Sequence, residues 1–178
     1  MKKTFILYNI IILHMLCHSA FVSSNTDNIE FSRILSLHTP TIKSSGQIEV
    51  ARLKVIDAVT ARKNLRKYNT SIAGYPVDQH LSALTTEERA LVFKVLLNHT
   101  SYSSRLVRCK NNYFIGFRFS GQATNKAHGK IEFALGIPCN QAIWAIPSGA
   151  ENILLGSILK KDSARQITDI FSKHEIQE

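Results

Sequence analysis

The sequence predicts an α+β domain in which a small antiparallel sheet of three or four strands packs against helices. Segments 112–119 and 130–137 alternate apolar and polar residues with the period of two that is typical of strands with one buried face. The polar residues between them are too few for the crossover helix that parallel strands need. We therefore expect a central hairpin, about 112–119/130–137, packed with a capped helix over about 85–98 and with C-terminal helices.

The N-terminus has the pattern of a secretory signal peptide. Lys2 and Lys3 precede an apolar stretch over 5–17, and small residues follow at 22–24. A helix of this stretch would be about 20 Å long, shorter than the roughly 30 Å hydrocarbon core of a bilayer. We expect no transmembrane segment after processing. The chain then divides into a cleaved leader over 1–24, a loosely ordered segment over 25–46 and a single α+β domain over 47–178.

Two alternatives for the leader remain open. Cleavage after Ser19 or Ala20 would also place small residues at the cut. Cys17 would carry a lipid anchor if the three residues before it fitted the usual motif, which they match poorly.

The first elements of the domain are short. Segment 47–56 is rich in branched residues and predicts a strand. Asp57 is placed to cap a short basic helix that would run through Tyr68. Residues 69–84 predict a loop, because proline in Gly74-Tyr75-Pro76 restricts itself and the residue before it.

The clearest helix signal begins at Thr85. Thr85 and Glu88 have the spacing of a capping box, in which each side chain binds the backbone amide of the other residue. The apolar run over 90–97 then predicts a helix that is buried nearly all round.

The two hairpin strands place their apolar residues at odd positions. Phe114 breaks this pattern, so it either packs on the second face of the sheet or is exposed for a partner. A turn at 138–141 leads to a third strand over 142–146, and the rest of the chain predicts helices, with a new start where Asp162 caps 163–174. The odd-numbered set is Tyr113, Ile115, Phe117, Phe119, Ile131, Phe133, Leu135 and Ile137.

Cys109 and Cys139 predict a disulfide. If Phe119 pairs with Lys130, Cys109 lies opposite residue 140, one position from Cys139, and both cysteines have the parity of the apolar faces. Closing a loop of about 30 residues would stabilise the fold by roughly 3 to 4 kcal/mol in the chain-entropy model. The alternative, in which either cysteine is a nucleophile activated by histidine, would leave the other without a partner.

Positive charge is concentrated in the middle of the chain. Removal of Lys2 and Lys3 with the leader lowers the formal charge from +9 to +7, and no acidic residue lies between Glu88 and Glu132. Such a stretch is either a solvated surface or a binding surface for an acidic protein, a polymer or an anionic surface. It gives no signal for specific nucleic-acid binding, and the sequence does not indicate the oligomeric state. The candidate binding residues are Arg108, Arg118, Lys126 and Lys130.

Motifs for catalysis, metals and cofactors are missing from the sequence. The histidines after the leader are scattered, without the spacing of a zinc site, and no phosphate-binding loop or nucleophile elbow is present. The candidates for acid–base work are His128 and His99 with Lys110, where an imidazole would act on a phosphodiester beside cations. The competing interpretation is that His128 is an exposed loop histidine.

These observations favour an exported, non-enzymatic binding protein of the periplasm or extracellular space. An inhibitor, an immunity-type protein or a host-directed factor would each fit a basic, disulfide-clamped domain. The alternative is a small secreted hydrolase, a nuclease or a cell-wall enzyme, that uses His128 or His99 near a basic surface.

Overall fold

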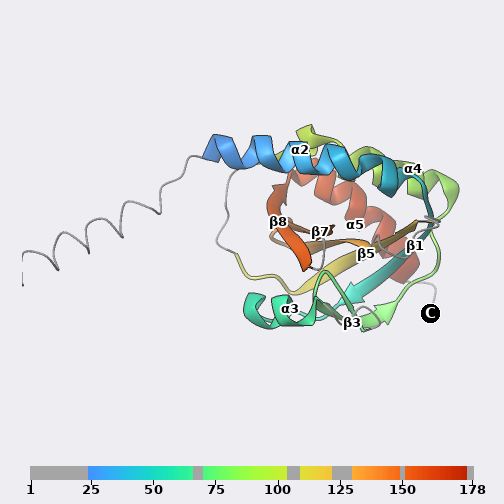
Figure 1. Ribbon diagram of the computed structural model, residues 1–178. Coiled ribbons are helices and arrows are strands. Elements are labelled where there is room, and N and C mark those ends of the chain that lie inside the picture. The colour runs from blue at the N-terminus through green and yellow to red at the C-terminus, as the bar shows by residue number, and fades with distance from the viewer. Residues whose placement is uncertain (1–23, 66–69, 104–108, 122–129, 149–150, 176–178) are drawn as a thin grey trace, which may run out of the picture.

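The computed structural model describes residues 24–65, 70–103, 109–121, 130–148 and 151–175. Its centre is an eight-stranded sheet with the order β2-β3-β1-β5-β6-β7-β8-β4, in which every neighbouring pair is antiparallel (Figure 1). The strands are β1 Ser45–Leu53, β2 Ser71–Ile72, β3 Tyr75–His80, β4 Tyr102–Ser103, β5 Tyr113–Gly121, β6 Ile131–Ile137, β7 Gln141–Ser148 and β8 Glu151–Leu159.

The predicted sheet of three or four strands was wrong in size. Residues 69–84 contain β2 and β3 in place of a loop, and residues 151–159 form β8 in place of a helix. β8 pairs with β7 from Ser148↔Glu151 to Gln141↔Ile158. Its apolar residues contact both sides of the sheet, Leu155 on one and Leu154 on the other, so the alternation that marks a half-buried strand is absent.

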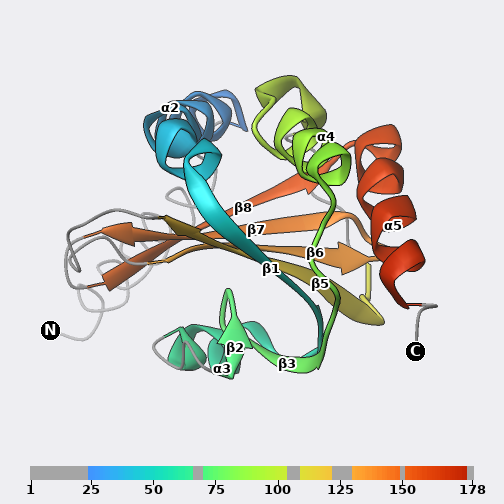
Figure 2. The same cartoon turned by 90° about the vertical axis from the view of Figure 1, so that its right-hand side faces the viewer.

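The helices are divided unequally between the two faces of the sheet. Figure 2 shows α2, α4 and α5 on one face and α3, with β2, on the other. The central pairing of β5 with β6 was predicted correctly, and the odd-numbered residues of both strands pack on the helix side. The helices are α2 Ser24–Lys43, α3 Ala58–Asn64, α4 Thr86–Leu96 and α5 Lys161–Glu175, with a short 3-10 helix, η2, at His99–Ser101.

Helix α2 replaces most of the loosely ordered segment that was expected over 25–46. Phe31, Leu35 and Ile42 are buried in the core, and their spacing of four and seven residues repeats along one stripe of a helix. Pro40 lies in the last turn of α2. The polar composition of the segment made this apolar stripe hard to recognise in the sequence. The helix is stable because the stripe packs on the sheet.

The caps of α3 and α4 were predicted correctly. The Asp57 carboxylate accepts from the amides of Val59 and Thr60, each at 3.0 Å. At α4, the amide of Glu88 donates to Thr85 Oγ1 at 3.2 Å, and Glu88 Oε2 accepts from the amide of Thr85 at 3.0 Å. Helix α4 is less buried than expected, because Ala90 and Lys94 are exposed.

The second face of the sheet is covered by α3 and the β2–β3 turn. Phe114 points to this face, where its ring stacks on Tyr75 with centroids 4.2 Å apart, so it is buried and not exposed for a partner. Gly74, at φ +82°, lets the turn approach α3, since a Cβ there would lie 2.1 Å from the carbonyl oxygen of Ala61.

A buried ionic network joins this cover to the sheet. The Arg118 side chain is 4% exposed, and its Nε lies 2.7 Å from Glu132 Oε1 while Nη1 lies 2.5 Å from Glu49 Oε2. The remaining nitrogen, Nη2, donates to the carbonyl of Ser71, and Glu132 Oε2 accepts from the amide of Ala73 at 2.7 Å. Burial raises the pKa of Glu132, and the guanidinium of Arg118 opposes that shift.

The Cys109–Cys139 disulfide is confirmed, with Cα atoms 5.6 Å apart. The register behind its prediction was one residue off, because Phe119 pairs with Ile131 and not with Lys130. The bridge still forms because the chain turns after β6, and Asn111 Oδ1 accepts from the amide of Cys139 at 3.2 Å.

Arg118→Met should destabilise the fold by about 3 to 5 kcal/mol, because Glu132 is left as an unpaired buried charge. Adding Glu132→Gln should recover part of this loss, since the amide oxygen can still accept from Ala73. The measurement is urea unfolding of the single and double variants. The deficit of the single variant should shrink as pH falls, because protonated Glu132 needs no cation. A double variant no more stable than the single one would contradict this account.

Replacing both bridging cysteines by serine should lower the free energy of unfolding by about 3 to 4 kcal/mol, because the unfolded chain gains entropy. Reductant should lower the stability of the native protein to the same level and leave the serine variant unchanged. Unfolding curves with and without reductant would show this. Equal stability of the native and serine proteins would mean that the disulfide contributes nothing.

Candidate functional site

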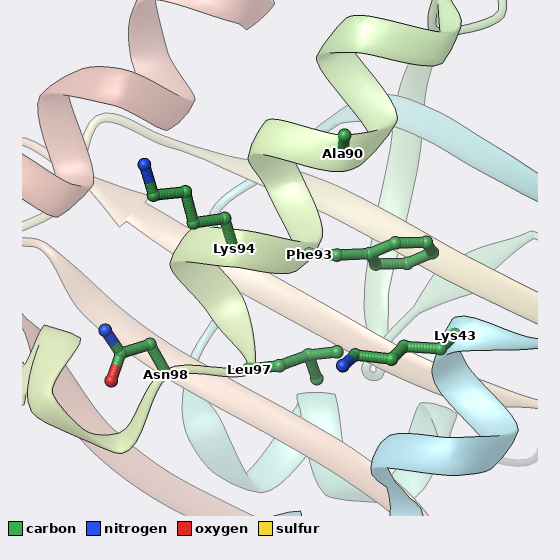
Figure 3. Close-up of a pocket in the computed structure, with 6 residues that line it drawn as sticks. All are labelled: Lys43, Ala90, Phe93, Lys94, Leu97 and Asn98. Atoms are coloured by element: carbon green, nitrogen blue, oxygen red, sulfur yellow. The ribbon is translucent and has the colours of Figure 1, made fainter.

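A groove between α2 and α4 is the first candidate site (Figure 3). Its volume is about 520 Å³, and we call it the α2–α4 groove. Its residues are Lys43 from the last turn of α2, Ala90, Phe93 and Lys94 along α4, and Leu97 and Asn98 just beyond the end of that helix.

The spacing of the α4 residues explains why they line one wall. Residues 90, 93, 94 and 97 recur at the three- and four-residue intervals that share one helix face. The opposite stripe of α4, which includes Val92 and Leu96, is buried in the core. Phe93 connects the two regions, because its ring is half-buried and its centroid lies 6.2 Å from that of Phe119. The groove therefore has a firm apolar floor.

Two lysines border this apolar floor. Lys43 and Lys94 are both exposed, and none of the ion pairs found among the described residues involves either of them. In Figure 3 the side chain of Lys43 extends from α2 toward Leu97. Each lysine also lies in the last turn of its helix, where it compensates the partial negative charge of the terminal carbonyls. The charges remain available to a ligand, because no carboxylate within the described ranges neutralises them.

A second cleft, of about 370 Å³, lies where β1 begins. Arg89 and Lys130 contribute its cations, and an Arg89 guanidinium nitrogen donates to the carbonyl of Gly46 at 3.3 Å. Glu49 in its wall is already paired with Arg118. Arg89 and Ala90 are consecutive on α4 but line different hollows. Basic side chains border both hollows, because Lys94 lines the α2–α4 groove and Arg89 lines the second cleft.

The predicted binding residues have different positions in the structure. Lys130 is exposed and lines the second cleft. Arg118 is turned inward, where Glu49 and Glu132 neutralise its charge, so it does not belong to the basic surface. Lys126 and Arg108 lie outside the described residues. Lys43 was missed because it lies in the segment that was predicted to be loosely ordered.

The predicted acid–base residues are not brought together among the residues described. His128 lies outside them, and His99 is exposed in η2, where its side chain takes part in none of the side-chain hydrogen bonds or ion pairs found among the described residues. Lys110 is exposed beside Cys109. A catalytic role for His128 or His99 therefore stays a prediction.

Two other histidines contact carboxylates. His80 Nδ1 lies 3.2 Å from Glu49 Oε1, and His174 Nε2 lies 2.9 Å from Glu88 Oε2. The second ring nitrogen of His174, Nδ1, lies 2.5 Å from Ser82 Oγ. No sequence motif could have shown this cluster, because His174 is 86 residues from Glu88 and 92 from Ser82.

Neither a metal centre nor a membrane helix is found in the described part of the chain. No group of three or more His, Cys, Asp or Glu side chains there is arranged to hold a metal ion. None of the described helices is long and apolar enough to span a bilayer.

The fold and the site define an α+β domain with an antiparallel sheet, a disulfide and a lysine-bordered groove between helices. Comparison with protein-family models, with curated proteins and with solved structures found no match to this chain. A proposal for function therefore has to come from the chemistry of these surfaces.

Proposed function

We propose that the protein is exported and acts as a binding protein that docks an acidic partner in the α2–α4 groove. The observation that carries this proposal is a pair of exposed lysines, without carboxylate partners in the described structure, on the borders of an apolar floor. The formal charge of +7 after loss of the leader adds a long-range attraction toward acidic molecules.

The two parts of the groove have different tasks. Phe93 and Leu97 offer a surface on which a partner's apolar side chain loses contact with water, at about 25 cal/mol per Å² buried. Lys43 and Lys94 contribute less energy, because exposed ion pairs are worth only about 0.2 to 1 kcal/mol each. They act chiefly on the association rate and on the choice of partner, since a basic segment would be repelled.

A groove between two helices suits an amphipathic helical segment. Such a segment presents apolar residues every three or four positions and would carry acidic residues beside them. This mode of binding fits an inhibitor, an immunity-type protein or a host-directed factor. Export is consistent with the Cys109–Cys139 bridge, because disulfides persist in oxidising compartments.

An acidic amphipathic peptide tests the groove. The probe is a fluorescent helix with leucine at three- and four-residue spacing and glutamate beside it, and its control has lysine in place of glutamate. Anisotropy titration should show tighter binding of the acidic peptide, weakened by salt. Lys43→Glu/Lys94→Glu should reduce its affinity about 30-fold, because two attractions of roughly 0.5 kcal/mol become repulsions of similar size, a change of about 2 kcal/mol.

A matched variant separates the groove from net charge. Lys63→Glu/Lys160→Glu changes the charge equally at two exposed lysines outside the groove, and it should bind the acidic peptide nearly as well as the native protein. Equal loss in both double variants would mean that overall charge, and not the groove, attracts the peptide. Equal affinity of the native protein for both peptides would reject the proposed chemistry.

Export is tested separately by expression of the whole chain in a bacterial host. The mature protein should appear outside the cytoplasm with a mass reduced by residues 1–24, because a signal peptidase removes the leader. Mass spectrometry of the fractions measures this. A chain that keeps its leader and remains in the cytoplasm would contradict export without affecting the groove.

A further inference from the structure

Ser82, His174 and Glu88 form a continuous hydrogen-bonded chain at the junction of α4 and α5. Ser82 Oγ lies 2.5 Å from His174 Nδ1, and His174 Nε2 lies 2.9 Å from Glu88 Oε2. Ser82 lies in the segment between β3 and α4, Glu88 in the first turn of α4 and His174 in the last turn of α5. The His174 and Glu88 side chains are 9% and 14% exposed, whereas Ser82 is open to solvent.

The hydrogen bonds fix the state of the imidazole. Hydrogen bonds lower the pKa of Glu88, first that from the amide of Thr85 and then that from His174, so the carboxylate is ionised at neutral pH. An ionised carboxylate can only accept, and the proton of neutral His174 must therefore lie on Nε2. The lone pair of Nδ1 then faces the Ser82 hydroxyl, which is the arrangement of a general base beside a nucleophile.

The surrounding structure holds these groups in place. Glu88 is fixed by the capping box with Thr85, and α5 is anchored by buried Ile170 and Phe171. The residue after His174, Glu175, lies 2.5 Å from a guanidinium nitrogen of Arg52 on β1. Both the base and the group that orients it are therefore held by rigid elements, as a catalytic site requires.

A purely structural role would explain only half of this arrangement. A contact between α4 and α5 needs only the hydrogen bond of His174 with Glu88, and it does not need a hydroxyl on the other ring nitrogen. Here that hydroxyl belongs to an exposed serine, so a molecule in solution can reach the oxygen.

We propose that Ser82 is the nucleophile and His174 the general base of a site that hydrolyses carboxylic esters, with Glu88 as the positioning residue. This activity is independent of the α2–α4 groove, which involves none of the three residues. It gives the chain a catalytic capacity that no sequence motif predicted.

The reaction proceeds in two balanced steps. Ser82 Oγ attacks the ester carbonyl while its proton passes to His174 Nδ1, and the tetrahedral adduct collapses as the leaving alkoxide takes that proton. Water then gives a proton to His174 as it attacks the acyl-serine, and the second adduct collapses as Ser82 Oγ leaves and takes that proton from His174, which releases the carboxylic acid and restores Ser82. Glu88 stabilises the imidazolium in both steps.

The surface position of Ser82 sets the kind of substrate. Ser82 is exposed, so an ester must present its carbonyl at the surface of the protein. We expect slow turnover that is seen best with activated esters, since binding energy for orientation is small.

A fluorophosphonate probe tests the nucleophile directly, and p-nitrophenyl acetate tests turnover. Mass spectrometry should find the probe on Ser82, and Ser82→Ala should abolish labelling while the contact between His174 and Glu88 keeps the fold intact. Ser44→Ala, at another exposed serine, is the matched control and should label as the native protein does.

The histidine and the glutamate are tested by the rate of labelling. His174→Gln should slow labelling at least roughly 100-fold, because the general base is gone. Glu88→Gln should slow labelling of the folded protein, because a neutral amide no longer stabilises the imidazolium that forms as Ser82 reacts. A purely structural role of Glu88 would lower the stability and leave the labelling rate of the folded protein unchanged. Lys43→Glu/Lys94→Glu should leave labelling unchanged, which keeps this test separate from that of the groove. A folded protein whose Ser82 is unlabelled at every pH, or is labelled equally in His174→Gln, would overturn the proposal.

Discussion

The buried charge of Arg118 is the constraint on which the arrangement of this fold depends. Arg118 lies in the middle of β5, and its cation needs acceptors because a lone charge away from water costs several kcal/mol. Glu132 on β6 and Glu49 on β1 supply them from the two neighbouring strands, and the carbonyl of Ser71 supplies a third. These contacts fix β1, β5 and β6 relative to one another and hold the β2–β3 turn on the sheet.

Helix α3 and the β2–β3 turn cover one face of the sheet, and the remaining helices pack on the other face. The core on that side is built from large side chains of the central strands, including Phe117, Phe133 and Trp144, all fully buried. Helices α2, α4 and α5 lie side by side over this core, as Figure 2 shows. Both candidate sites involve this layer, the groove where α2 meets α4 and the serine cluster where α4 meets α5. Helix α4 therefore contributes to both, with its first turn to one and its later turns to the other.

Sequence patterns predicted an element correctly where that element depends on residues close to one another in the chain. The capping box at Thr85, the Asp57 cap and the alternation over 112–119 and 130–137 each depend on residues a few positions apart. The signals failed for β8 and for α2, and the reasons differ. β8 contacts both apolar clusters, so its residues do not alternate, and α2 has a narrow apolar stripe within a polar segment. The size of the sheet could not be predicted for the first of these reasons.

The sequence by itself determined the central hairpin, two helix starts, the pairing of the cysteines and the positive charge of the chain. The tertiary structure alone decided which charges face solvent. Arg118 has the sequence context of a surface cation and lies inside, whereas Lys43 lies at the border of a groove between two helices. It also brought Ser82, Glu88 and His174 together from three elements. The reason is physical: helix caps and strand alternation are set by neighbours in the chain, but the partner of a charge or of an imidazole is set by the packing of distant elements.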